Sequence, residues 1–191
     1  MIQGVSGSFD IACSNPSTFT ARIFYSEQYD KATGKHIVSI TGISIRSTEY
    51  GHEWYPHGSI SIDGAVVGSM NNSSPATHEV SLTAGSGWHK VTLYYGSNDF
   101  PWNSEEIPSN PDGTKTVEIA VDFLLYRSSS TPRPSFKGSI LLELTPTPTG
   151  LAYIDNGSEN VPCQICIDNG GAFDRYMAYV DNGDAWDPLN S

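Results

Sequence analysis

The sequence is poor in basic residues, and it has no long hydrophobic run. Only 10 Lys and Arg stand against 21 Asp and Glu, which gives a formal net charge of −11. Nucleic-acid binding needs clustered Lys and Arg that displace phosphate counterions, and an anionic membrane surface attracts the same residues. No apolar run approaches the roughly 20 residues of a membrane-spanning helix. We therefore expect neither nucleic acid nor a membrane among the partners.

Two further signals are missing, a secretion signal and a disulfide framework. The N-terminus, Met1-Ile2-Gln3-Gly4, has neither the basic start nor the apolar stretch of a signal peptide, so we expect folding in a cytoplasm. The only cysteines are Cys13, Cys163 and Cys166. The last two have C-x-x-C spacing, but no second ligand pair lies near enough to complete a zinc site. We expect packing cysteines.

Catalytic and metal-binding motifs are equally scarce. His52-Glu53-Trp54-Tyr55-Pro56-His57 looks like H-E-x-x-H, but the second His is one residue too far and Pro56 would break the helix. Ser-His-Asp catalysis is not excluded by residue counts, yet no G-x-S-x-G elbow is present. Glu105-Glu106 is more typical of a solvated acidic patch than of a glycosidase pair, and no complete calcium loop occurs. We predict a non-enzymatic protein without a cofactor or metal.

The sequence does contain a regular alternation of apolar and polar residues. Between residues 3 and 145, apolar and polar residues alternate in several segments, among them residues 19–25, 117–123 and 140–144. A period of two indicates strands with one buried face, and no segment has a convincing helical period. Eight or nine short strands separated by Gly, Pro and Ser predict an all-β fold. We expect a jelly-roll-like antiparallel β-sandwich at residues 1–146.

Two local features of this sandwich can be predicted. Residues 36–47 form one long strand whose apolar positions change parity at Thr41-Gly42, from Val38 and Ile40 to Ile43 and Ile45. A β-bulge at that point would return both pairs to the same face. Further along, Asp63-Gly64 predicts a two-residue hairpin turn that sets Ile62 opposite Ala65 and Ile60 opposite Val67.

The C-terminal region is repetitive. After a stiff Pro/Thr linker at 147–150, Asp-Asn-Gly follows a short β-prone run three times, with the aspartates 13 residues apart (Asp155, Asp168 and Asp181). Asn and Gly tolerate the positive φ of a type I′ turn. We therefore expect three hairpins within 151–191, with turns at Asn156-Gly157, Asn169-Gly170 and Asn182-Gly183. Units this short must stack on each other or on partner chains, which is typical of an assembly module.

Two aromatic segments are candidate ligand-binding loops. Trp54 and Tyr55 lie among His52, Glu53 and His57, and Trp102 lies near Asp99 and Asn103. Sugar faces stack on aromatic rings while sugar hydroxyls bond to a polar rim. We name Trp54, Tyr55, Trp102, Asn103 and Asp99 as the candidate site. The competing interpretation is that the rings plug the ends of the sandwich.

Two motifs resemble phage proteins. Asn110-Pro111-Asp112-Gly113-Thr114-Lys115-Thr116-Val117 resembles the N-x-D-G-T-K-T-V sequence that opens a late strand in minor structural and tail proteins of long-tailed phages of Gram-positive bacteria. The threefold Y-I-D-N-G repeat resembles C-terminal tails on structural proteins of phages and prophages of gut Firmicutes. The resemblance implies a virion component with a sandwich similar to carbohydrate-binding modules, and it carries over no catalytic residue.

These observations lead to one expected function and one alternative. We expect a non-enzymatic virion structural protein, attached to tail or capsid, whose sandwich serves assembly or host-surface adhesion. Its expected partners are other virion proteins, further copies of itself and a host cell-surface glycan. The alternative is a carbohydrate-binding domain whose main role is host glycan recognition. Because the chain is acidic, neutral sugars are favoured over teichoic-acid phosphates as ligands.

Overall fold

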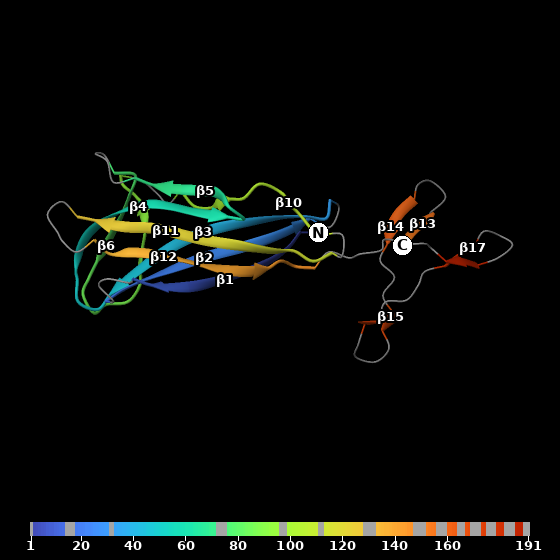
Figure 1. The fold of residues 1–191 in the computed structure, drawn as a ribbon, viewed down its shortest axis with the longest axis horizontal. Helices are drawn as coiled ribbons and strands as arrows, with labels where there is room; N and C mark the ends of the chain where they lie inside the picture. Colours follow the sequence, from blue (N-terminus) through green and yellow to red (C-terminus); the bar gives the residue numbers. More distant parts are fainter. Residues whose placement is uncertain are drawn as a thin grey trace.

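The fold is all-β, as the alternation predicted. The computed structural model describes residues 2–13, 18–30, 33–71, 76–95, 99–110, 113–127 and 133–146, and the backbone of six short strands beyond residue 151. Up to residue 146 the described strands form two antiparallel sheets that face each other as a β-sandwich (Figure 1). No helix able to cross a membrane is found in the described part of the chain.

The sandwich has more strands than the eight or nine expected, because several short edge strands join the long ones. The described strands are β1 (Ile2–Ala12), β2 (Phe19–Asp30), β3 (Lys35–Ser47), β4 (His52–Ile62), β5 (Ala65–Met70), β6 (His78–Leu82), β7 (His89–Lys90), β8 (Thr92–Leu93), β9 (Trp102–Asn103), β10 (Ile107–Pro108), β11 (Thr116–Tyr126) and β12 (Ser135–Glu143).

The first sheet is a meander of the three N-terminal strands. Strands β1, β2 and β3 are neighbours in that order, and β7, β9 and β10 pair with the free edge of β3. The β1–β2 register runs without interruption from Ile2 opposite Asp30 to Ala12 opposite Thr20. The three long strands thus form a continuous sheet, and the three short strands extend it beyond β3.

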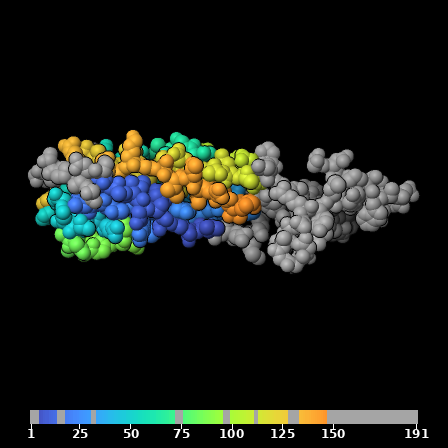
Figure 2. Space-filling view, turned by 60° about the horizontal axis from the view of Figure 1, so that its bottom comes forward, coloured from blue at the N-terminus to red at the C-terminus, as the bar shows by residue number. Residues whose placement is uncertain are grey.

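The second sheet is centred on β4 and β11. Its order is β12-β11-β4-β6-β8, and β5 also pairs with β4. Along β11 the residues from Val117 to Leu125 alternate between exposed or half-buried and fully buried positions, so one face lines the core and the other faces outward. Edge strands β1 and β12 contact each other, which closes one side of the sandwich (Figure 2).

The core fills the space between the two sheets. It consists mainly of aliphatic residues with a few large rings, and its largest fully buried members include Phe19, Phe123, Phe136, Ile23, Ile40 and Leu125. Each such side chain contributes roughly 1.5–3 kcal/mol by leaving water. Cys13 is buried among them, and its Sγ accepts a hydrogen bond from the Ser135 amide at 3.2 Å. Cys13 is thus a packing cysteine, whereas the side chains of Cys163 and Cys166, for which packing was expected, lie outside the described residues.

The predicted bulge in β3 is confirmed. Phe24 lies opposite Gly42 and Tyr25 lies opposite Ile40, so Thr41 is the extra residue. The four apolar residues on both sides of it are at most 1% exposed (Val38, Ile40, Ile43 and Ile45). The bulge therefore lets one strand of changing parity serve a single core.

The β4–β5 hairpin has the expected turn and a different register beyond it. Asp63 and Gly64 have φ angles of 50° and 83°, the positive values of a type I′ turn. Ile62 pairs with Ala65 as expected. The expected partner of Ile60, however, is wrong: a register shift places Ile60 opposite Gly68. Val67 is thus the extra residue of a second bulge. The shift places Gly68 against the Trp102 ring, where a side chain would clash.

The C-terminal repeats form three separate two-stranded sheets. They are β13 (Ala152–Asp155) with β14 (Asn160–Cys163), β15 (Ile167–Asp168) with β16 (Phe173–Asp174), and β17 (Tyr179–Asp181) with β18 (Trp186–Pro188). In each, the repeated Asp pairs with the residue five positions later (Asn160, Phe173 or Trp186). Four residues therefore separate the last paired positions. The predicted turn residues Asn156, Gly157, Asn169, Gly170, Asn182 and Gly183 lie outside the described residues.

Candidate functional site

The sequence-predicted aromatic platform does not exist as one exposed surface. Trp54 is 2% exposed and Trp102 is 8% exposed, so both rings belong to the core. Trp54 packs edge-on against Phe19 with the ring centroids 5.4 Å apart. The competing interpretation, that these rings plug the sandwich, is the correct one for both tryptophans.

Trp102 is held in place from several sides. Phe100 lies 4.4 Å away and His78 lies 5.7 Å away, measured between ring centroids. On a further side the ring covers Gly68, where an added Cβ would come within 2.0 Å of Trp102 Cδ2. Asp99 Oδ1 bonds to buried His78 at 3.1 Å, which gives this carboxylate a structural partner. Asn103 is exposed at the edge of β3, opposite Ser39.

Of the five predicted residues, Tyr55 alone belongs to an outward-facing aromatic cluster. Tyr55 on β4 pairs across strands with Tyr126 on β11. On its other side its ring meets Tyr94 edge-on, with centroids 5.7 Å apart, and Tyr94 lies 4.0 Å from Tyr95. We call these four residues the tyrosine row. They come from segments far apart in the sequence, and only strand pairing brings them together.

The tyrosine row is a partly exposed surface. Tyr55, Tyr94 and Tyr126 are half-buried, whereas Tyr95 is 86% exposed. The Arg133 guanidinium covers the Tyr126 ring at 4.5 Å, a cation–π contact. One end of the row is therefore capped by a cation, and the other end presents a free ring to solvent.

Two phenols of the row, those of Tyr94 and Tyr55, have raised pKa values. The Tyr94 hydroxyl donates a hydrogen bond to the Tyr95 hydroxyl at 2.9 Å, and this bond, with partial desolvation, raises the pKa of Tyr94 to about 12. Desolvation, with nearby Glu53 and Glu79, also raises the pKa of Tyr55. At neutral pH Tyr94 and Tyr55 therefore offer neutral hydroxyl groups beside two carboxylates.

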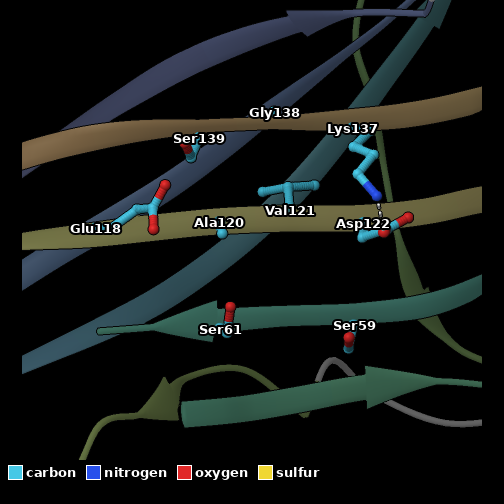
Figure 3. A pocket seen from close by; sticks show the side chains of 9 residues that line it. All are labelled: Ser59, Ser61, Glu118, Ala120, Val121, Asp122, Lys137, Gly138 and Ser139. Carbon is cyan, nitrogen blue, oxygen red and sulfur yellow. Dashed lines mark hydrogen bonds and ion pairs between the residues drawn. The ribbon is translucent and has the colours of Figure 1, made fainter. Parts of the chain in front are cut away.

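A polar hollow lies on the same outer face, further along β4. It encloses about 390 Å³ and is lined mainly by small residues of β4, β11 and β12 (Figure 3; Ser59, Ser61, Ala120, Gly138 and Ser139, with Glu118, Val121, Asp122 and Lys137). Lys137 Nζ and Asp122 Oδ2, both largely exposed, form an ion pair at 3.0 Å at one end of it. We call it the serine hollow. Its hydroxyls and charged groups can donate and accept hydrogen bonds.

A second constellation lies inside the sandwich and has the spacing of a Ser-His-Glu triad. His36 Nε2 lies 2.9 Å from Ser109 Oγ, and His36 Nδ1 lies 2.7 Å from Glu27 Oε1. The Glu27 carboxylate also accepts hydrogen bonds from the Thr145 amide and the Thr145 hydroxyl, both at 2.9 Å. No local motif in the sequence signals this arrangement.

The burial of this triad favours a structural role. His36 is 0% exposed, so a substrate has no path to its ring. The Asn110 amide, which follows Ser109 and would be the natural oxyanion donor, already donates to the Thr114 carbonyl at 2.7 Å. The bonds satisfy buried polar groups and join β2, β3, the segment after β10 and the end of β12. We call it the interior clamp.

The second buried histidine shows the same pattern of bonding. His78 is 1% exposed, and its ring nitrogens lie 2.9 Å from Thr77 Oγ1 and 3.1 Å from Asp99 Oδ1. Both buried rings are thus bonded at both nitrogens. His52 and His57 are exposed and five residues apart on β4, so they point to opposite faces of a strand. Among the described residues no cluster of three potential metal ligands occurs.

The outer face of the first sheet differs in character. Trp88 there is half-buried beside two guanidinium groups, with Arg22 at 4.2 Å and Arg46 at 4.8 Å from its ring. Arg22 also forms a two-bond ion pair with Asp10, which lowers the pKa of that carboxyl. This ring is therefore in contact with two cations, whereas the ring of Tyr95 is 86% exposed.

Comparisons of the chain with protein families, with curated proteins and with solved structures found no match. The functional argument therefore rests on the chemistry of the tyrosine row, the serine hollow and the C-terminal hairpins.

Proposed function

We propose that this protein is a non-enzymatic structural protein of a phage virion, attached to tail or capsid, and that its sandwich is displayed for assembly or host-surface adhesion. The observation that carries the proposal is the repeated C-terminal hairpin. Three copies recur with a period of 13, and each pairs only within its own two-stranded sheet in the described backbone. The two motifs that resemble phage structural proteins support the same role.

An isolated two-stranded hairpin is marginally stable in water, because it cannot bury enough apolar surface. Strands of only two to four residues bury even less apolar surface. Copies of this chain or other virion proteins would supply the missing contacts. On this account the hairpins dock the chain to the particle, and the sandwich remains available on the outside.

A second candidate function is a carbohydrate-binding domain whose main role is recognition of host glycan. It is favoured by the tyrosine row, since half-exposed rings beside carboxylates suit sugar hydroxyls and sugar faces. The two functions are compatible if the displayed sandwich is also the adhesive part.

Mass spectrometry of particles purified from a culture that carries this gene tests the proposal. We expect the chain in intact particles at a fixed ratio to the major capsid or tail protein. A variant that ends after residue 146 should be lost from the particles, whereas the full-length variant Tyr95→Ala should be retained. Absence of the full-length chain from the particles would overturn the proposal.

A further inference from the structure

Tyr95 is poorly explained by folding alone. It is 86% exposed, so its ring contributes little to the core. Its φ of 63° lies in the left-handed region, which side-chain-bearing residues adopt at a cost and which Gly or Asn would adopt more easily. A strained, exposed aromatic residue is more typical of a binding site than of a turn. Its backbone conformation places the ring at the open end of the tyrosine row.

The arrangement of the row suits a flat, hydroxyl-rich ligand. The ring of Tyr94 contacts the ring of Tyr95 at a tilt, and Tyr55 in turn contacts Tyr94 edge-on. The open ring can stack on the C–H face of a sugar. The Tyr55 hydroxyl donates a hydrogen bond to Glu53 Oε2 at 3.4 Å, and Glu79 lies on β6, the strand paired with this part of β4. The two carboxylates can accept charge-assisted hydrogen bonds from sugar hydroxyls.

Charge selects among possible ligands. Glu53 and Glu79 beside the row, together with a net charge of −11, repel phosphate and carboxylate groups. The cation that contacts the row, Arg133, lies over Tyr126 at the end opposite Tyr95. A neutral saccharide is therefore favoured over an anionic polymer.

The same face continues into the serine hollow. Tyr55, Ser59 and Ser61 occupy alternate outward positions of β4, and the strand rises about 3.4 Å per residue, so Tyr55 and Ser61 lie about 20 Å apart. We propose that the outer face of β4, β11 and β12 binds a neutral oligosaccharide. Its first sugar stacks on Tyr95, and its following units extend along β4 toward the serine hollow. This inference rests on the proposed display role only for the source of the glycan.

An array of neutral oligosaccharides built from glucose, galactose, rhamnose or N-acetylglucosamine tests the inference with the purified full-length chain, and poly(glycerol phosphate) serves as the anionic probe. We expect binding to at least one neutral oligomer and weaker binding to the anionic polymer. Affinity for the bound oligomer should change less than about twofold between low and high salt, since few ion pairs are screened. No binding to any neutral oligomer, or a preference for the anionic polymer, would overturn the inference.

Variants locate the site on the bound oligomer. Tyr95→Ala should weaken binding about tenfold through lost stacking, whereas Tyr95→Phe should keep most of the affinity because it retains the ring. Trp88→Ala, on the outer face of the other sheet, is the matched control and should leave the affinity unchanged. Unfolding temperatures of all variants confirm that the sandwich is intact. Equal affinity of the wild type and Tyr95→Ala would overturn the site assignment.

The outcomes also separate this inference from the proposed function. A chain that is present in particles but binds none of the neutral oligomers overturns the glycan site alone. A chain that binds an oligomer through Tyr95 but is absent from particles overturns the virion role alone.

Discussion

Gly68 is the position at which the burial of Trp102 can be tested most sharply. An added Cβ at Gly68 would lie 2.0 Å from Trp102 Cδ2 and 2.1 Å from Cε3, far inside van der Waals contact. The indole has no room to retreat, because it is 8% exposed and packs against Phe100 and His78. We therefore expect Gly68→Ala to force β5 away from the ring or the ring out of its site.

The size of the effect follows from two opposing contributions. Overpacking of a well-filled core costs about 1–3 kcal/mol. Replacing Gly by Ala restricts the unfolded chain, which returns about 0.4–1 kcal/mol where the backbone conformation is compatible. We expect a net loss of about 1–1.5 kcal/mol in the free energy of unfolding, or about 2–6 °C in Tm for a chain of this size.

Urea and thermal unfolding measure this difference. Gly87→Ala is the matched control, because no atom lies within 4 Å of its added Cβ, and it should change stability by less than about 0.5 kcal/mol. If Gly68→Ala were as stable as Gly87→Ala, the Trp102 ring would not cover β5. The exposed platform of Trp54, Tyr55 and Trp102 would then have to be reconsidered.

Three further predictions concern the interior clamp, the tyrosine row and the bulge. Ser109→Ala leaves the buried Nε2 of His36 unpaired and should lower the free energy of unfolding by about 1–3 kcal/mol in urea titrations; ester hydrolysis by the wild type that disappears in this variant would instead identify a catalytic triad. The pKa of Tyr94 is raised to about 12 from 10.0. The stability that its protonated, hydrogen-bonded hydroxyl contributes is therefore fully present below pH 10 and is lost as the pH rises toward 12. Absorbance titration should show this late ionisation, and Tyr95→Phe should return the pKa toward 10.0; an unchanged titration would contradict the hydrogen bond. Deletion of Thr41 removes the extra residue and brings Val38 and Ile40 into regular alternation with Ile43 and Ile45 on one face, so circular dichroism should still show a folded β-protein; an unfolded deletion variant would refute the bulge.

The strand pattern could be predicted because each of its signals lies within a short stretch of the sequence. Alternation revealed the long strands, and the parity change between Ile40 and Ile43 revealed the bulge at Thr41, since both signals lie within a few residues. The second bulge, at Val67, was missed because β5 is an edge strand with several exposed positions, so its apolar residues do not mark a face. A register without a buried face is weakly specified by the sequence.

The candidate site could be predicted only in part. Trp54 and Trp102 have polar neighbours, which made them resemble a binding loop, but in a sandwich the partner sheet decides whether a ring is covered. Tyr55 was found, whereas Tyr126 and Tyr95 were not. They join it through cross-strand pairing that no local pattern shows.

The interior clamp was hidden for the same reason. Glu27 and His36 lie on neighbouring strands, and Ser109 and Thr145 approach them from distant parts of the chain. No short motif encodes such an arrangement. Its geometry resembles that of a catalytic triad, and the burial of His36 and the bonded Asn110 amide separate the two interpretations.

A density map of the assembled particle tests the central claim most directly. We predict that the map places this chain at the outside of the virion, with its C-terminal hairpins in contact with other subunits. The outer face of β4 and β11, with Tyr95, should be turned toward solvent. A map in which this face is buried against a neighbouring subunit, or in which the chain is absent, would contradict the account.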